Sequence, residues 1–376
     1  MATKTFYTKP FDKATKTKVE IFSAYLNEAL PVFIHQKYWE EIFIYDLFAG
    51  QGFDEQGEFG TAFNILKGVS QHCKAIIENK KKLYVILNDK ECKDALSHNV
   101  NNFLINCKKN CENQNCILDD KHLIINDKDF REYFNQIIYP NLKKKKDAMK
   151  LIFLDPFNFI MDSDLFGKLT SLPKTDFMCF IPTTFLRRLP NELTFKRFID
   201  DYNLTFSQTN YKHSHRIIAQ YIRKLIPDSK EYYIGHFSIE KLQEQGSGKN
   251  YYGLIFGSNS IFAAEKFQRV CWKLDTISGE ADFNIDNEPT YGGNKDLFNM
   301  PPLKIEKIEK EIKDLIITKK VKTDIDVYKF AVKNCCLPKH AASILKQLMK
   351  DKIIREFKTH NSDIHKINNP IIIEIL

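Results

Sequence analysis

Residues 41–52 read Glu41-Ile-Phe-Ile-Tyr-Asp46-Leu47-Phe48-Ala49-Gly50-Gln51-Gly52, an apolar run that ends in an acid and is followed by two closely spaced glycines. The run has no polar alternation, so it predicts a buried strand over 41–46, and the glycines predict a tight turn. Three later runs repeat this form over 82–89, 122–127 and 150–155, and they end at Asp89, Asp127 and Asp155. A fifth buried strand is predicted over 176–181.

Helical patterns separate these strands along the chain. We predict one helix over 16–38, with a break near Pro31, and a second over 60–79. A third follows the strand over 82–89 and ends at about 107, and two more span 130–138 and 165–172. Apolar strands that alternate with helices are typical of a parallel α/β sheet covered on both faces, here a Rossmann-like sheet. Ligands of such sheets bind outside the carboxyl ends of the strands, so the four terminal aspartates are expected to line one pocket.

The second half of the chain carries an insertion and a separate C-terminal segment. Residues 185–250 are predicted to be a basic, mainly helical insertion that includes Arg187 and Arg188, followed by a strand over 251–257 and a helix over 263–273. A loop rich in Gly, Asp and Asn spans 279–293, and prolines near 301 indicate a linker. The predicted division is an N-terminal helical segment over 1–40, a sheet domain over 41–300 and a C-terminal domain over 301–376.

The C-terminal domain is predicted to be a winged helix. Three helical patterns over 305–317, 324–334 and 338–350 precede two candidate wing strands over 353–357 and 370–376. Residues 301–376 hold 16 basic and 10 acidic residues, most of the chain's net charge of +8. We expect Lys339 and Lys346 of the third helix, with Arg187 and Arg188, to contact a DNA or RNA backbone. The alternatives are a solvated lysine-rich surface, a helical oligomerisation cap and a protein-binding module.

Composition excludes several other classes of protein. The hydrophobic fraction of 43% argues against a disordered chain, and no apolar run approaches the roughly 18 residues of a membrane span. No signal peptide is evident, and nine cysteines, an odd number, favour a reducing cytoplasm. The spacing of Cys107, Cys111 and Cys116 does not fit a radical-type iron–sulfur cluster, and no fourth ligand for zinc is obvious, so no metal is predicted.

The turn after the first strand is similar to the S-adenosylmethionine motif of class I methyltransferases. A dinucleotide fingerprint fits less well because no third glycine follows Gly52 at the required spacing. The similarity implies that Asp46, Phe48, Gly50 and Gly52 hold the methionine part of S-adenosylmethionine, that Asp89 binds the ribose and that Asp127 lies near the adenine. The alternatives are a turn without a ligand, an exposed loop acid at Asp89 and a helix N-cap at 126–129.

The fourth strand ends in Asp155-Pro156-Phe157, which resembles the Asp-Pro-Pro-Tyr/Phe motif of methyltransferases that act on amino groups of nucleic-acid bases. The resemblance implies that Asp155, Pro156 and Phe157 hold the acceptor, although one proline stands where that motif has two. The alternative is a stiff turn after a buried strand. No Pro-Cys pair is present for cytosine carbon-5 chemistry, and no nucleophile elbow supports a serine hydrolase.

Together, four stretches resemble the three-Cys-motif partner protein family: 45–52, 57–62, 153–157 and 270–275. The resemblance spans about residues 16–300. It implies a class I methyltransferase fold that works with a radical-enzyme-like partner carrying a three-Cys motif, and it implies no settled reaction. Two functions are therefore expected: an S-adenosylmethionine-dependent methyltransferase of nucleic acid, or a non-catalytic cofactor-binding or nucleic-acid-binding adaptor. Either suits phage defence.

Overall fold

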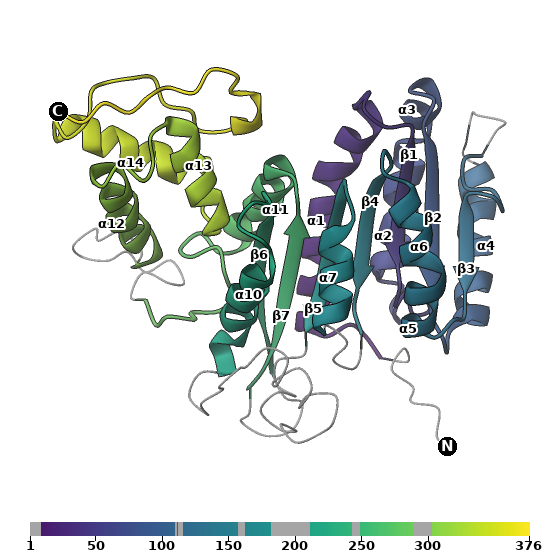
Figure 1. Cartoon of the computed structure of the whole chain (residues 1–376). Helices are drawn as coiled ribbons and strands as arrows, with labels where there is room; N and C mark the ends of the chain where they lie inside the picture. Colours follow the sequence, from purple (N-terminus) through teal and green to yellow (C-terminus); the bar gives the residue numbers. More distant parts are fainter. Residues whose placement is uncertain are drawn as a thin grey trace. The chain divides into compact units, whose positions relative to one another are not determined.

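The structure is a computed structural model that describes residues 9–109, 111, 116–156, 162–181, 211–242, 249–288 and 303–376. It is a mixed α/β structure with a seven-stranded, mostly parallel sheet in the order β3-β2-β1-β4-β5-β7-β6, consistent with a Rossmann-like fold (Figure 1). The chain divides into two compact units, Met1–Thr205 with Lys241–Tyr252, and Phe206–Glu240 with Gly253–Leu376. Among the described helices, none combines the length and apolar character needed to span a bilayer.

The first unit confirms the five predicted parallel strands. They are β1 (Glu41–Asp46), β2 (Lys82–Asn88), β3 (Leu123–Asn126), β4 (Met149–Leu154) and β5 (Thr175–Ile181). Asp46 pairs in register with Leu87 on one side and Phe153 on the other, so the carboxyl ends of β1, β2 and β4 lie at one level. On one side of β1 the sheet continues with β2 and β3, and on the other side it continues with β4 and β5. The end of β1 is therefore the point where the strand order reverses.

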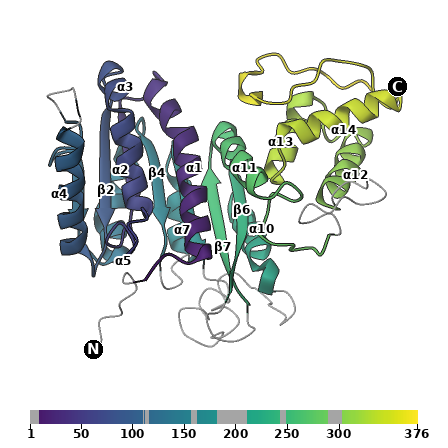
Figure 2. The ribbon, with the colours of Figure 1, turned by 180° about the vertical axis from the view of Figure 1, so that it is seen from behind.

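Helices cover both faces of these strands. α1 (Lys13–His35) and α2 (Thr61–Gln71) lie on one face, and α6 (Tyr139–Lys144) and α7 (Ser163–Ser171) on the other (Figures 1 and 2). Asp12 caps α1 by accepting from the backbone N–H of Thr15 at 2.7 Å. The predicted break near Pro31 is wrong, because the helix runs through this proline to His35. Buried Phe33 and Ile34 hold the last turn against the core and offset the hydrogen bond that proline removes.

Two other predicted helices are subdivided. The pattern over 60–79 forms α2 and α3 (Cys73–Glu78), which are separated at His72, where ψ is 8°. After α4 (Lys93–Lys109), the pattern over 130–138 begins as α5 (Phe130–Tyr133), widens into a π-helical turn η1 (Phe134–Ile138) and continues as α6. The hydrophobic period identified these helices but gave no signal for a change of helix type.

The second unit corrects the predicted insertion. Residues 182–210, with Arg187 and Arg188, lie outside the described residues, and the following part is helical only in η2 (Tyr211–His213) and α10 (Ser214–Leu225). The segment then forms the strand β6 (Tyr233–Leu242), followed by β7 (Lys249–Ser258) and α11 (Ile261–Leu274). Residues 232–239 are all buried. A strand buried on both faces shows no alternation of polar and apolar residues. Because this strand also contains Gly, His and Ser, it lacks the continuous apolar run that identified the other strands.

The C-terminal region confirms three helices: α12 (Leu303–Ile317), α13 (Asp324–Lys333) and α14 (Pro338–Lys350). The predicted wings are not strands. Within 303–376, a 3₁₀ turn η4 (Ile364–Lys366) and two isolated antiparallel bridges, Thr323 to Ile372 and Ile354 to Ile375, occupy that region. Single bridges supply too little pairing for a ladder, although Ile354 and Ile373 are buried.

Candidate functional site

The turn after β1 depends on glycine at two positions. Gly50 and Gly52 have φ angles of 58° and 98°, in the region that disfavours side chains. A Cβ atom on Gly52 would lie 2.2 Å from the ring of Phe63 on α2. The carbonyl of Gly52 also accepts from the N–H of Gly60 at 2.8 Å, which ties the turn to the second glycine-rich stretch. The backbone here is therefore close-packed on one side and cannot take a side chain.

Asp46 ends β1 and is fully buried beneath this turn. Its carboxylate accepts from the N–H of Phe48 at 3.2 Å and from the hydroxyl of Thr61 at the start of α2. Burial raises the pKa of Asp46 to about 7, against the lowering effect of these two hydrogen bonds, and the nearby charges of Asp155 and Asp89 raise it further. Three of the predicted carboxylates therefore lie close enough to interact.

Asp89, at the end of β2, connects that strand to the glycine turn. One carboxylate oxygen accepts from the N–H of Gly50 at 2.9 Å, and the other from the N–H groups of Glu91 and Cys92 at 3.0 and 2.9 Å. Asp89 is only 8% exposed, so the alternative of an exposed loop acid is wrong. A carboxylate offers about four acceptor positions, and the oxygen on Gly50 keeps one for a hydroxyl donor.

Asn88 is a structural residue of the site that the sequence did not indicate. Its side chain is buried and forms two hydrogen bonds with the backbone of Lys128, at 3.1 and 3.0 Å. The backbone carbonyl of Asn88 accepts a hydrogen bond from the N–H of Ala49 at 3.0 Å. It therefore joins the loops that follow β1, β2 and β3. An asparagine next to an acid reads as an ordinary loop residue, so no sequence signal distinguished it.

We expect Asn88→Ala to lower the free energy of unfolding by about 1–2 kcal/mol, because two backbone groups of Lys128 lose their partner. The exposed Asn79, which bonds only to the carbonyl of Ala75, is the matched control, and Asn79→Ala should change that energy by less than about 0.5 kcal/mol. Urea unfolding followed by circular dichroism measures both. Equal effects of the two substitutions would contradict the role of Asn88.

Asp155 follows the end of β4 and is paired with Lys18 of α1. The Lys18 ammonium forms an ion pair with the Asp155 carboxylate and lies 5.0 Å from the centre of the Phe180 ring. Pro156 is buried, and Phe157 lies outside the described residues. Lys18 was missed, but a signal existed: together with Phe22 and Tyr25 it follows the i, i+4, i+7 spacing of the buried stripe of α1.

Asp127 is more exposed than the other three carboxylates. Its side chain is 45% exposed and pairs with Lys93 of α4 at 3.2 Å, a hydrogen bond that lowers the pKa of Asp127. The neighbouring Asp129 is the N-cap of α5 and accepts from Arg131 at 3.0 Å, which confirms the capping alternative for this stretch. Phe48 is half-buried and packs against Phe130, with ring centres 5.1 Å apart.

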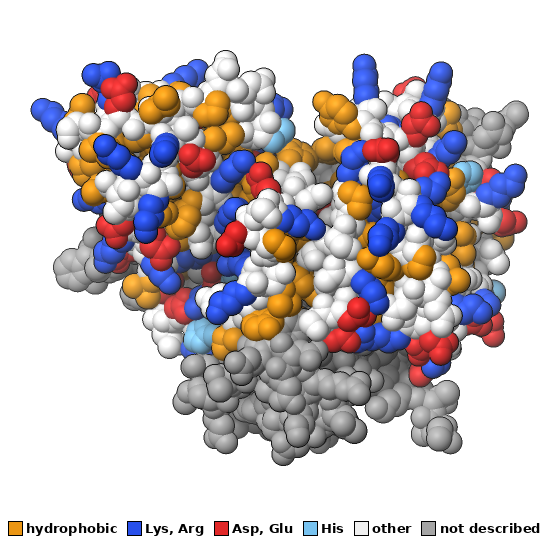
Figure 3. All heavy atoms as spheres, in the orientation of Figure 1, with side chains coloured by type: hydrophobic (Ala, Val, Ile, Leu, Met, Phe, Trp, Pro, Cys, Tyr) orange, Lys and Arg blue, Asp and Glu red, His pale blue; other side chains and the backbone are white. Residues whose placement is uncertain are grey.

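The two lysines predicted to contact nucleic acid lie on α14. Lys339 and Lys346 are both exposed and lie seven residues apart on α14, so they share one face of that helix. On the side drawn in Figure 3, however, basic and acidic side chains are interspersed over the described surface. The lysines are accessible, but no uniformly basic field marks this side.

A fourth cysteine joins the three that the sequence singled out. Burial raises the pKa of the Cys73 thiol to about 11, and Cys116, Cys107 and Cys111 each raise it further, so all four lie in one neighbourhood. All are free thiols. Cys73, at the start of α3, is distant in the chain from the other three, and spacing alone could not connect it to them.

Comparison with models of protein families finds no match for this chain. Comparison with curated proteins finds none either. The resemblance noted in the sequence therefore stays a prediction, and the site must be interpreted from its own geometry. That geometry places a buried acid, a second acid with a free acceptor position and an ion-paired third acid around a glycine turn, an arrangement suited to a cationic ligand with hydroxyl groups.

Proposed function

We propose that the chain is a class I S-adenosylmethionine-dependent methyltransferase that acts on nucleic acid together with a three-Cys-motif partner protein. The observation that carries the proposal is the convergence of Asp46, Asp89 and Asp155 around Gly50 and Gly52, where the strand order reverses. Sheets of this class bind ligands in that crevice.

The strand order supports this class over a dinucleotide-binding enzyme. The common Rossmann order is 3-2-1-4-5-6, whereas here β7 is inserted between β5 and β6. The order here therefore departs from that of the dinucleotide-binding fold. Strand order is a property of the fold, so it favours a class of cofactor but does not identify the methyl acceptor.

The cofactor supplies an activated methyl group on a sulfonium, and the residues of this chain supply binding and alignment. Asp46 and the backbone of Gly50 and Gly52 would hold the cationic methionine part, beside Phe48. The free acceptor position of Asp89 would take a ribose hydroxyl, and Asp127 would approach the adenine after leaving Lys93. Asp155, Pro156 and Phe157 would orient an acceptor amine that displaces Lys18.

The test of the cofactor is isothermal titration of the full chain with S-adenosylmethionine and S-adenosylhomocysteine. We expect binding by the wild type and at least about tenfold weaker binding by Asp89→Asn, because a charge-assisted hydrogen bond to the ribose is lost. Asp94→Asn, an exposed acid on α4 near the same loop, is the matched control and should bind as the wild type does. Folded protein that binds neither ligand would contradict the proposal.

A second candidate function is a non-catalytic cofactor-binding or nucleic-acid-binding adaptor of the partner. The ion pair between Lys18 and Asp155 favours this candidate, because Lys18 binds the carboxylate that an acceptor amine would need. A methyl-transfer assay on mixed DNA and RNA, with and without the partner, separates the two candidates. Methyl transfer lost in Asp155→Asn supports the enzyme, and cofactor binding without transfer in either condition supports the adaptor. Lys339 and Lys346 would contact the phosphate backbone in both.

A further inference from the structure

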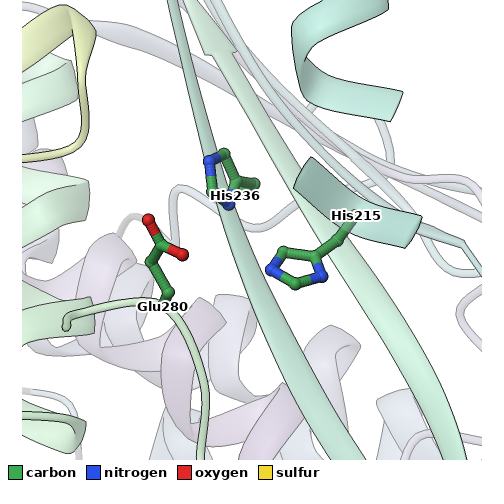
Figure 4. A group of neighbouring side chains, drawn as sticks. All are labelled: His215, His236 and Glu280. Carbon is green, nitrogen blue, oxygen red and sulfur yellow. The ribbon is translucent and has the colours of Figure 1, made fainter. Parts of the chain in front are cut away.

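A second group of side chains with chemical potential lies in the unit that contains α10 and β6, and the proposed function does not use it. His215 of α10, His236 of β6 and Glu280 of the loop after α11 point toward one small space (Figure 4). One candidate ligand atom from each residue lies within 4.8 Å of those of the other two. The relative exposures are 1%, 6% and 6%, so the group is enclosed by protein.

Two nitrogens of this group have no partner. Within the described residues, His215 Nε2 and His236 Nδ1 are buried and make no hydrogen bond, and the same holds for the hydroxyl of Ser238. Ser238 lies two residues after His236 on β6, hence on the same face of the strand. Buried polar atoms are rarely left unsatisfied, and two imidazole nitrogens of one group without a partner indicate an absent occupant.

The loop that carries Glu280 is built to present it. Asp275, at the C-terminus of α11, accepts hydrogen bonds from the N–H groups of Ile277, Ser278 and Glu280 at 3.0, 3.2 and 3.1 Å. Gly279 has a φ of 63°, and a Cβ atom there would lie 2.6 Å from the ring of Trp272. The N–H of Ser238 donates to the carbonyl of Glu280 at 2.7 Å and fixes the loop to β6.

Charged side chains surround this group. Arg216 interacts with the carboxylates of Glu280, Asp286 and Glu288, Lys304 pairs with Glu280, and the charge of Arg223 acts on His236. Arg216 bonds to both oxygens of Asp286, at 2.8 and 2.6 Å, and also reaches Glu280. Each Glu280 oxygen has a second lone pair, so the contacts with Arg216 and Lys304 leave it able to bind a metal.

We propose that His215, His236 and Glu280 bind a divalent transition-metal ion of the zinc type. Two imidazoles and one carboxylate are a donor set that zinc accepts, with a water as fourth ligand. Tetrahedral bonds of about 2.0–2.2 Å bring ligand atoms to about 3.3 Å from one another, so binding requires side-chain shifts on the order of 1 Å. Because the group is buried, the site is structural and holds α10, β6 and the loop over 275–281 together.

The test begins with the unaltered full chain. We expect about one cobalt ion per chain in a cobalt titration of metal-free protein, with visible bands of tetrahedral cobalt and no near-ultraviolet thiolate-to-cobalt band. We also expect a chelator to lower the thermal midpoint of unfolding and zinc to restore it. A thiolate band would assign the ion to the cysteines around Cys73, and no bound ion would leave buried water as the occupant; either result overturns the proposal.

Variants then assign the ligands. His215→Gln and His236→Gln should each lower zinc content, measured by mass spectrometry, from about one ion per chain to less than about 0.1. His213→Gln is the matched control, because His213 precedes the same helix, lies outside the group of three and has its Nε2 3.4 Å from Asp286. Cys107→Ser is the control for the thiols. Both controls should keep the ion, and its loss from either control alone would contradict the assignment.

Discussion

Gly52→Ala is expected to be far more destabilising than Gly57→Ala, although both replace a loop glycine with positive φ. The backbone cost is common to the two substitutions, about 1 kcal/mol for a side chain in the left-handed region. At Gly57 a Cβ atom meets nothing within 4 Å, whereas at Gly52 it meets two ring carbons of Phe63 at 2.2 and 2.4 Å. Overpacking adds about 1–3 kcal/mol, so Gly52→Ala should cost about 2–4 kcal/mol in total. Urea unfolding midpoints measure the difference.

A double-mutant cycle identifies the cause. Phe63→Ala alone should destabilise the chain, because Phe63 is 3% exposed, but it opens the space that the new methyl group needs. We therefore expect Gly52→Ala to cost much less in the Phe63→Ala background than in the wild type. Strictly additive effects would show that Phe63 does not enforce glycine at position 52, and that the turn is shaped by backbone conformation alone.

The five parallel strands were predictable because each is a short apolar run, and four of the five end at or next to an aspartate. That pattern reports burial on both faces, and in a parallel sheet it also reports where each strand ends. The positions of Asp46, Asp89 and Asp155 at one edge of the sheet therefore follow from the sequence pattern. Asp127 followed the same rule, but its side chain is exposed and pairs with Lys93, a lysine of α4 that the strand pattern does not contain.

The buried partners of the site were not predictable in the same way. Lys18 reaches Asp155 from a helix more than 130 residues earlier in the chain, and Asn88 bonds to the backbone of Lys128, which has no sequence signature. His215, His236 and Glu280 come from a helix, a strand and a loop whose order shows no metal-binding spacing. Local patterns predict elements, whereas these contacts are set by how the elements pack.

The pH dependence of cofactor affinity is the strongest test of Asp46. Its pKa is raised to about 7, so Asp46 of the free protein changes its protonation state near neutral pH. A cationic ligand beside the carboxylate favours the ionised form, and binding therefore releases a proton. Affinity for S-adenosylmethionine should rise by about tenfold between pH 6 and pH 8 and change little above pH 8. Isothermal titration across that range measures it.

Asp46→Asn separates this effect from the ligand's own titration, which both proteins experience equally. The variant should bind more weakly at pH 8 by about tenfold or more and should lose the part of the pH dependence that is due to Asp46. Asparagine can still accept from the N–H of Phe48 and donate to Thr61, so the turn remains supported.

The stability of the ligand-free protein should move in the opposite direction. The pKa of Asp46 is higher in the folded than in the unfolded chain, so the native state loses stability as pH rises from about 4 to about 7. Asp46→Asn carries no charge there, and its thermal midpoint at pH 8 should equal or exceed that of the wild type. Weaker binding by a protein of equal or greater stability would identify Asp46 as a ligand-binding group. A variant that loses stability and affinity together would instead show that Asp46 only supports the turn.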